Sequence, residues 1–257
     1  MLLAIDTSTS WASLALLDAT GTPRAVRSWA VGQQHSVQIF GGIEQVLADG
    51  AAQRNDVTAV AVATGPGSFN GLRVAVTVAK TLAFVWGVPL VGVATLDALA
   101  QVQNHAHGAS RTIFAALEAG RDELYIGWYN LKNDARIVER SGAISIATAT
   151  ERSALGGMLQ SDRPVLVTGE LTPTHVQELA RIFGIATDAP GPGAAFADPL
   201  AAPDRAVGVG EIALAQLARG DVADLLALEP MYVRRPNITV STRHVIPGSP
   251  SATTGNA

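Results

Sequence analysis

Residues 1–18 read MLLAIDTSTSWASLALLD, and this stretch decides the class of fold. Two apolar runs of strand length, Leu2–Asp6 and Ala12–Asp18, flank a turn rich in Thr and Ser, and a third run spans Arg24–Val31. Short apolar runs separated by polar turns are typical of consecutive β-strands. The chain is therefore predicted to begin with a meander of three strands.

Helices and buried strands alternate after this meander. Ser36 is expected to cap a helix that runs to Asp49, and Asn70 a longer helix that runs to Trp86, because short polar side chains accept hydrogen bonds from free helical N–H groups. The continuously apolar runs Val57–Ala63 and Leu90–Val93 are typical of strands buried on both faces. A further helix is predicted over Leu96–Gln103.

The same order of elements then begins again. The predicted strands are Thr112–Leu117, Glu123–Asn130, Arg136–Ser141 and Val165–Thr168, and the predicted helices are Thr150–Leu159 and Thr172–Phe183. This repeated β-β-β-α-β-α order predicts an α/β protein with two lobes of common plan, over residues 1–103 and 104–230. The Pro/Gly-rich stretch 188–203 is expected to be an exposed loop, and a helix over 205–219 can pack back onto either lobe, the first included. Residues 247–257, rich in Ser, Thr and Gly, are expected to be disordered.

Composition excludes several classes of function. A 257-residue chain that is 48% hydrophobic and 16% charged can bury a substantial core, and its net charge of -4 argues against unaided binding of a nucleic-acid backbone. The absence of cysteine excludes disulfides and thiolate chemistry. The N-terminal apolar run is too short for a signal peptide, and no apolar run reaches the ~18 residues that span a bilayer. We expect a soluble, cytoplasmic protein without a membrane partner.

The turn after the first predicted strand is a candidate phosphate-binding hairpin. Proteins of the actin/hexokinase/Hsp70 (ASKHA) superfamily carry Asp-x-Gly-Thr/Ser there, where the acid holds metal-bound water and the glycine lets backbone N–H groups approach phosphate. This chain has Ser in place of that glycine, and the corresponding turn of the second lobe has Glu in place of Asp. Both turns are predicted to be degraded phosphate loops, and the alternative is an ordinary polar hairpin. Their residues are Asp6, Thr7, Ser8, Thr9, Glu118 and Gly120.

A glycine-rich loop connects a buried strand to the long helix 70–86. Free N–H groups at a helix N-terminus favour negative charge, so an anion or a partner carboxylate can be expected there. The alternative is that the glycines serve close packing of helix and sheet. The Gly-Lys-Ser/Thr ending of a P-loop is missing. The residues concerned are Gly65, Pro66, Gly67, Ser68, Gly71 and Arg73.

No metal-binding spacing of histidines occurs, and no Gly-x-Ser-x-Gly elbow accompanies a possible hydrolase triad. The helices 36–49 and 70–86 carry apolar residues on more than one face, which include Phe84 and Val85, so a second chain is a candidate to cover one of these faces. The residues expected at that interface are Val37, Phe40, Ile43, Val76 and Leu82. Arg234 and Arg235 form a possible contact for tRNA or a partner, or belong to a solvated tail.

The sequence resembles the bacterial TsaB (YeaZ) family in four stretches, which are Met1–Asp18, Ala63–Arg73, Pro89–Leu99 and Pro230–Arg234. The resemblance is strong over residues 1–130 and sparse from there until it resumes at Pro230. Two positions depart from the family pattern: Asn70 stands where the family usually has Thr, and Glu118–Arg121 stands where it usually has Asp-Ala-Arg.

The resemblance implies an ASKHA fold and a role in making threonylcarbamoyladenosine beside the tRNA anticodon. It implies a non-catalytic subunit that pairs through its first-lobe helices with a metal-containing TsaD-like subunit, which a TsaE-like ATPase joins. Accordingly, we expect no cofactor and no metal in this chain, a homodimer when it is alone, and contact with tRNA only through the complex. The alternatives are a stand-alone ATP-dependent kinase-like enzyme that uses the cleft between the lobes and a metallopeptidase.

Overall fold

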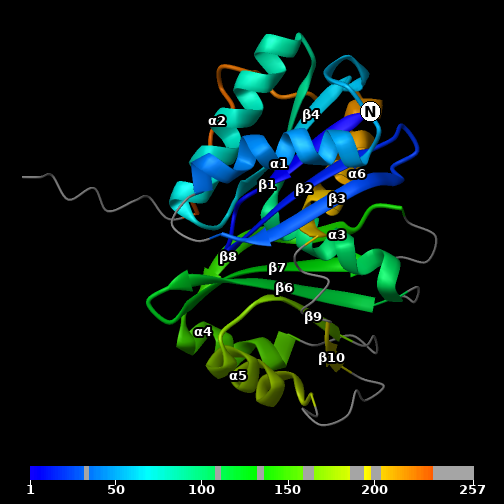
Figure 1. Ribbon diagram of the computed structural model, residues 1–257. Coiled ribbons are helices and arrows are strands. Elements are labelled where there is room, and N and C mark those ends of the chain that lie inside the picture. Colours follow the sequence, from blue (N-terminus) through cyan, green and yellow to red (C-terminus); the bar gives the residue numbers. More distant parts are fainter. Residues whose placement is uncertain are drawn as a thin grey trace, which may run out of the picture.

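Two five-stranded mixed sheets with the same strand order form the framework of the protein (Figure 1). The computed structural model describes residues 1–31, 35–107, 111–131, 136–158, 165–185, 194–197 and 204–233. The sheets run β3-β2-β1-β4-β5 and, in the same sense, β8-β7-β6-β9-β10. In each sheet the first three strands in this order pair antiparallel. The third, fourth and fifth strands pair in parallel. The prediction of a two-lobed α/β protein with a repeated plan is therefore confirmed.

The elements of the first sheet follow the expected order. They are β1 (Leu2–Asp6), β2 (Trp11–Leu17), β3 (Pro23–Ala30), α1 (His35–Asp49), the 3-10 turn η1 (Arg54–Asp56), β4 (Ala59–Gly65), α2 (Phe69–Trp86), β5 (Leu90–Ala94) and α3 (Thr95–His107). The cap of α2 differs from the expectation. Ser68, not Asn70, precedes the helix, and its Oγ accepts a hydrogen bond from Gly71 N at 3.3 Å.

The second sheet repeats this order with shorter helices. Its elements are β6 (Arg111–Gly120), β7 (Glu123–Leu131), β8 (Glu139–Ala147), α4 (Ala149–Ala154), η2 (Leu155–Met158), β9 (Val165–Glu170), α5 (Pro173–Phe183) and β10 (Ala194–Phe196), and α6 (Arg205–Ala218) follows. The strand predicted over 136–141 begins three residues later and extends to Ala147. The prediction missed these bounds because most residues of this strand are exposed and form no continuous apolar run. β10 lies inside the stretch expected to be a loop, and it pairs in parallel with β9.

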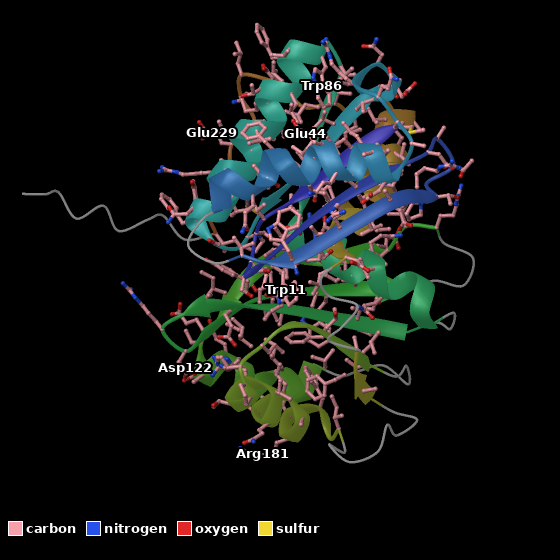
Figure 2. The ribbon with its side chains drawn as sticks, viewed as in Figure 1. Trp11, Glu44, Trp86, Asp122, Arg181 and Glu229 are labelled. Atoms are coloured by element: carbon pink, nitrogen blue, oxygen red, sulfur yellow. The ribbon has the colours of Figure 1, made fainter. Side chains whose placement is uncertain are left out.

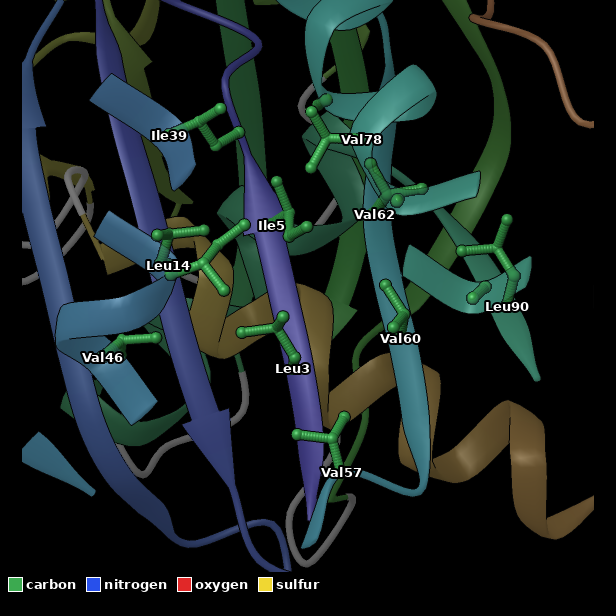
Figure 3. Close-up of a cluster of buried hydrophobic side chains, with 14 of the residues drawn as sticks. Leu3, Ile5, Leu14, Ile39, Val46, Val57, Val60, Val62, Val78 and Leu90 are labelled. Carbon is green, nitrogen blue, oxygen red and sulfur yellow. The ribbon is translucent and has the colours of Figure 1, made fainter. Parts of the chain in front are cut away.

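The core lies in layers on both faces of the two sheets. Figure 3 shows the cluster between the first sheet and the helices α1 and α2, where Ile5, Ile39 and Val62 are completely buried. α6 packs on the opposite face of that sheet. α3 contacts both α6 and the second sheet, whose other face is covered by α5. None of the described helices is both long and apolar enough to cross a lipid bilayer.

The segment Arg205–Val233 packs on the first sheet, although we assigned residues up to 230 to the second lobe. Besides the contacts of α6, Ala223 N donates to the carbonyl of Leu90 at 2.8 Å, and Met231 N donates to the carbonyl of Thr64 at 2.6 Å. Backbone hydrogen bonds to β5 and β4 thus fix this segment beside the first sheet. The boundary near residue 103 stays a prediction.

Candidate functional site

The acid of the first hairpin is completely buried and bonded within the chain. Asp6 ends β1, and its Oδ1 accepts hydrogen bonds from Ser8 N at 2.7 Å and Ser8 Oγ at 2.6 Å. Its Oδ2 accepts a hydrogen bond from Arg205 Nε at 2.9 Å, and both side chains are fully buried. This carboxylate therefore faces protein donors on both oxygens.

Arg205, the first residue of α6, connects the first hairpin with the second sheet. Its Nη2 donates to Thr9 Oγ1 at 2.7 Å and to the carbonyl of Trp11 at 2.9 Å, and its Nη1 donates to the carboxylate of Glu170 at the end of β9. Burial by itself lowers the pKa of the guanidinium, but the carboxylates of Asp6 and Glu170 raise it more, so the net shift of the Arg205 pKa is upward. The group is a permanent cation at this position.

The glycine-rich loop packs its backbone directly onto the first hairpin. Cβ atoms added at Gly67 and Gly71 would lie 2.2 Å from Ser8 O and 1.9 Å from Thr7 O. Thr7 Oγ1 donates to the carbonyl of Gly71 at 2.6 Å, and Ser68 N donates to the carbonyl of Ser8 at 2.6 Å. These contacts give the glycines the packing role that the sequence left as an alternative. An anion on this loop stays a prediction.

Arg73, expected to add a charge to this loop, contacts aromatic residues instead. Its guanidinium lies 4.1 Å from the centroid of the Phe69 ring, and its Nε donates to the hydroxyl of Tyr232 at 3.4 Å. The rings of Phe69 and Tyr232 are 5.4 Å apart. Arg234 and Arg235, which follow this tyrosine, lie outside the described residues, so their role stays a prediction. Pro66 is buried in the same loop.

The second hairpin is held by its own chain in a similar way. Glu118 Oε1 lies 2.8 Å from His175 Nδ1 and accepts a hydrogen bond from Thr172 N at 2.8 Å. The other ring nitrogen, His175 Nε2, lies 3.0 Å from Asp122 Oδ1 in the turn of the hairpin, which Figure 2 shows close to α5. Gly120 has a positive φ of 73°, and a Cβ added there would meet no atom within 4 Å.

In both lobes, then, a buried side chain from a helix binds the acid of the hairpin. Arg205 of α6 plays this part for Asp6, and His175 of α5 plays it for Glu118. In the described part of the chain, no group of three His, Asp or Glu side chains has the arrangement of a metal site. Chemically, the acids that end β1 and that lie near the end of β6 are both engaged in pairs within the chain.

The first-lobe helices expose only part of the surface that the sequence predicted. Phe40 is 53% exposed, but Ile43 and Val76 are buried in the core of this chain and Leu82 is half-buried, so Ile43 and Val76 are corrected to core residues. Val37 lies in α1, and its side chain is outside the description. Among the described side chains of these two helices, Phe84 and Val85 near the end of α2 are the most exposed large apolar ones, at 75% and 59%.

The sequence analysis missed the two helix residues, Arg205 and His175, that bind the acids of the first and second hairpins. Arg205 contacts Asp6 and Glu170 across 199 and 35 positions, and His175 contacts Glu118 across 57. No local spacing signals such pairs. The one available signal was the charged residue at the start of α6, followed by the apolar residues of that helix.

Comparisons with known proteins find relatives of two names, TsaD and TsaB. A family model described as TsaD, tRNA N6-adenosine threonylcarbamoyltransferase, matches residues 29–180. The tRNA threonylcarbamoyladenosine biosynthesis protein TsaB of Bacillus subtilis is 33% identical over 187 residues, which cover 71% of this chain and 76% of that protein. The protein of the same name from Escherichia coli is 34% identical over 133 residues, which cover 52% of this chain and 55% of that protein.

Solved structures place the fold. A Pseudomonas aeruginosa structure, described as an uncharacterized protein with similarity to peptidase YEAZ, has a TM-score of 0.70 at 25% identity and covers 91% of this chain and 99% of its own. Component A of (R)-2-hydroxyglutaryl-CoA dehydratase from Acidaminococcus fermentans has a TM-score of 0.50 at 11% identity, with 84% and 98% coverage, and is similar in fold alone. The ASKHA fold is thus confirmed. By sequence and by structure, the chain belongs to the TsaB (YeaZ) family.

Proposed function

We propose that this chain is a non-catalytic partner subunit of the complex that makes threonylcarbamoyladenosine on tRNA next to the anticodon. Its relatives carry the name of that biosynthesis. The proposal that the subunit is non-catalytic rests on the Asp6–Arg205 pair. There a buried guanidinium is bonded to the carboxylate that would have to hold a metal-bound water. A chain that neutralises this acid internally is poorly equipped to turn over ATP by itself.

The proposed partner is a TsaD-like catalytic subunit, with a TsaE-like ATPase as the third member, in the cytoplasm. The first-lobe helices are the proposed contact surface because they expose Phe40, Phe84 and Val85 on a protein whose other large apolar residues are mostly buried. In the absence of a partner, the same surface is proposed to form a homodimer. Contact with tRNA is proposed to occur only through the complex.

Titration of the purified chain with Mg-ATP tests the non-catalytic part. We expect no measurable heat of binding and no release of phosphate, because Asp6 and Glu118 are paired with Arg205 and His175. Addition of the TsaD-like and TsaE-like proteins is expected to produce ATP-dependent modification of tRNA that none of the three gives singly. Micromolar binding with turnover by the chain alone would instead support a stand-alone kinase-like enzyme.

Substitution of Phe40 and Phe84 by Asp tests the contact surface. An aromatic anchor at the centre of an interface commonly contributes about 2 kcal/mol or more. Loss of even one such anchor weakens binding about 30-fold, so the double variant should bind the TsaD-like subunit at least that much more weakly. Because both side chains are exposed, its free energy of unfolding should stay within about 0.5 kcal/mol of the wild type. Isothermal titration and urea denaturation measure the two quantities.

Val222→Asp is the matched control for this surface. Val222 is an exposed apolar residue outside α1 and α2. The control variant should bind the TsaD-like subunit with wild-type affinity. Equal binding by the double variant and the wild type would contradict the proposed interface while leaving the family assignment unaffected.

A further inference from the structure

The carboxylate of Glu170 is the point at which the second sheet contacts the first hairpin. Its Oε1 accepts a hydrogen bond from Thr9 Oγ1 at 2.6 Å and its Oε2 one from Ser10 Oγ at 3.0 Å, and the guanidinium of Arg205 also donates to Oε1. Glu170 ends β9, whereas the three donors pack with the first sheet. One carboxylate of the second lobe therefore enters a polar socket of the first.

The first sheet is hydrogen-bonded to both sequence neighbours of Arg205. Asp204 Oδ1 accepts a hydrogen bond from Ser28 Oγ of β3 at 3.0 Å, and Ala206 N donates to Ser13 Oγ of β2 at 3.3 Å. With its two neighbours bonded to the first sheet, Arg205 is a preorganised part of the socket. Glu170 is the member that the second lobe supplies.

Other directional contacts between the lobes come from α3. Asp97 Oδ1 accepts hydrogen bonds from the Tyr129 hydroxyl at 2.8 Å and from Arg140 Nη1 at 3.0 Å. Leu96 and Leu99 of α3 pack among apolar residues of the second sheet.

The Arg205–Glu170 pair is better shielded from water than the Arg140–Asp97 pair, because its guanidinium is fully buried whereas that of Arg140 is 36% exposed. Its attraction is therefore weakened less by solvent. At the opposite end of the strands, Arg136 Nη2 donates to the carbonyl of Thr20 at 2.9 Å in an exposed position. An exposed contact of this kind contributes little.

We propose that Glu170 and Arg205 form a latch that sets the angle between the two lobes without nucleotide or metal. The guanidinium lies between the carboxylates of Asp6 and Glu170 and donates to both. Its planar fork matches carboxylate oxygens, and its charge offsets the repulsion between the two acids. The latch is independent of partner binding, so its test does not depend on the proposed function.

Removal of the arginine side chain converts this position into a site for a small planar cation. In Arg205→Gly, Asp6 and Glu170 are left without the guanidinium that pairs with them, and their repulsion should open the angle between the lobes. Guanidinium ion has the shape, charge and donors of the missing group. We expect it to bind between the two carboxylates at low, non-denaturing concentration and to close the lobes again.

Spin labels on the outer helices of the two lobes measure this angle. The chain contains no cysteine, so cysteines introduced at the exposed positions Glu44 and Arg181, which Figure 2 shows on opposite sides of the molecule, take the labels specifically. Labelled protein is diluted with unlabelled protein so that only distances within one chain contribute. The protein with Arg205 should give one narrow distance distribution, unchanged by Mg-ATP.

Arg205→Gly should lose the narrow peak and shift to longer distances, and guanidinium chloride should restore the peak. Glu170→Gln, which keeps the size but loses the charge, should also broaden the distribution, but guanidinium should not restore it because Arg205 still fills the site. Arg219→Ala, at the other end of α6, should behave as wild type. An unchanged distribution in folded Arg205→Gly would overturn the latch. If that variant does not fold, an unchanged distribution in Glu170→Gln would overturn it.

Discussion

Gly71→Ala should be among the most destabilising single substitutions in this protein. The added Cβ would lie 1.9 Å from the carbonyl oxygen of Thr7, a distance that no pair of such atoms tolerates. The hairpin cannot retreat, because Thr7 Oγ1 and Ser8 O are both hydrogen-bonded to the same loop and helix start. Overpacking of this kind costs about 1–3 kcal/mol and occasionally more. Urea denaturation should show a loss at or above the top of that range.

Gly41→Ala is the matched control because it makes the same chemical change in another helix. Gly41 lies in α1, and a Cβ added there would meet no atom within 4 Å. Alanine is favoured over glycine inside a helix by about 1 kcal/mol, so this variant should be more stable than the wild type. Equal stability of the two variants would show that the glycine-rich loop does not depend on close backbone contact.

The fold could be predicted from the sequence because its signals are local. The apolar runs of β1, β2 and β4 are strands, and the segments predicted as helices around α2, α5 and α6 are helices within a few residues. The signal failed where neighbouring strands decide the structure. β8 is largely exposed, and only its first residues fell within the predicted strand 136–141. β10 is three residues long and is recognisable only through its pairing with β9.

The candidate site was predictable only in part. The turns at Asp6 and Glu118 could be found because each follows an apolar strand, and their altered residues are visible in the sequence. Their partners could not be found, because Arg205 and His175 come from helices that the fold brings to the hairpins. For the same reason, the sequence could not separate buried Ile43 from exposed Phe40 on one helix, since both are apolar residues near the expected face.

Arg152→Met should destabilise the second lobe strongly. Arg152 is buried in α4, and its Nε donates to Glu178 Oε2 at 2.9 Å. Its Nη1 donates to the carbonyl of Asp122 at 2.6 Å, and Asp122 follows Arg121 in a turn where both residues have positive φ, at 59° and 56°. The arginine thus stabilises a backbone conformation that residues other than glycine rarely adopt. Water can reach the carboxylates of Glu178 and Asp122, which are 24% and 65% exposed, so the main loss is that of the hydrogen bonds from the buried guanidinium. The loss of such a donor costs about 1–3 kcal/mol.

Arg27→Met separates the effect of burial from the loss of an ion pair. Arg27 Nη1 lies 2.7 Å from Asp49 Oδ2, a shorter distance than the 3.4 Å between Arg152 Nη2 and Asp122 Oδ2, but both side chains are exposed. An exposed pair contributes about 0–1 kcal/mol, because water stabilises the separated charges almost as well as the ion pair does. The free energy of unfolding should therefore fall several times more in Arg152→Met than in Arg27→Met. Similar losses in the two variants would contradict the claim that the Arg152 network fixes the second hairpin, since solvation would then compensate equally at both positions.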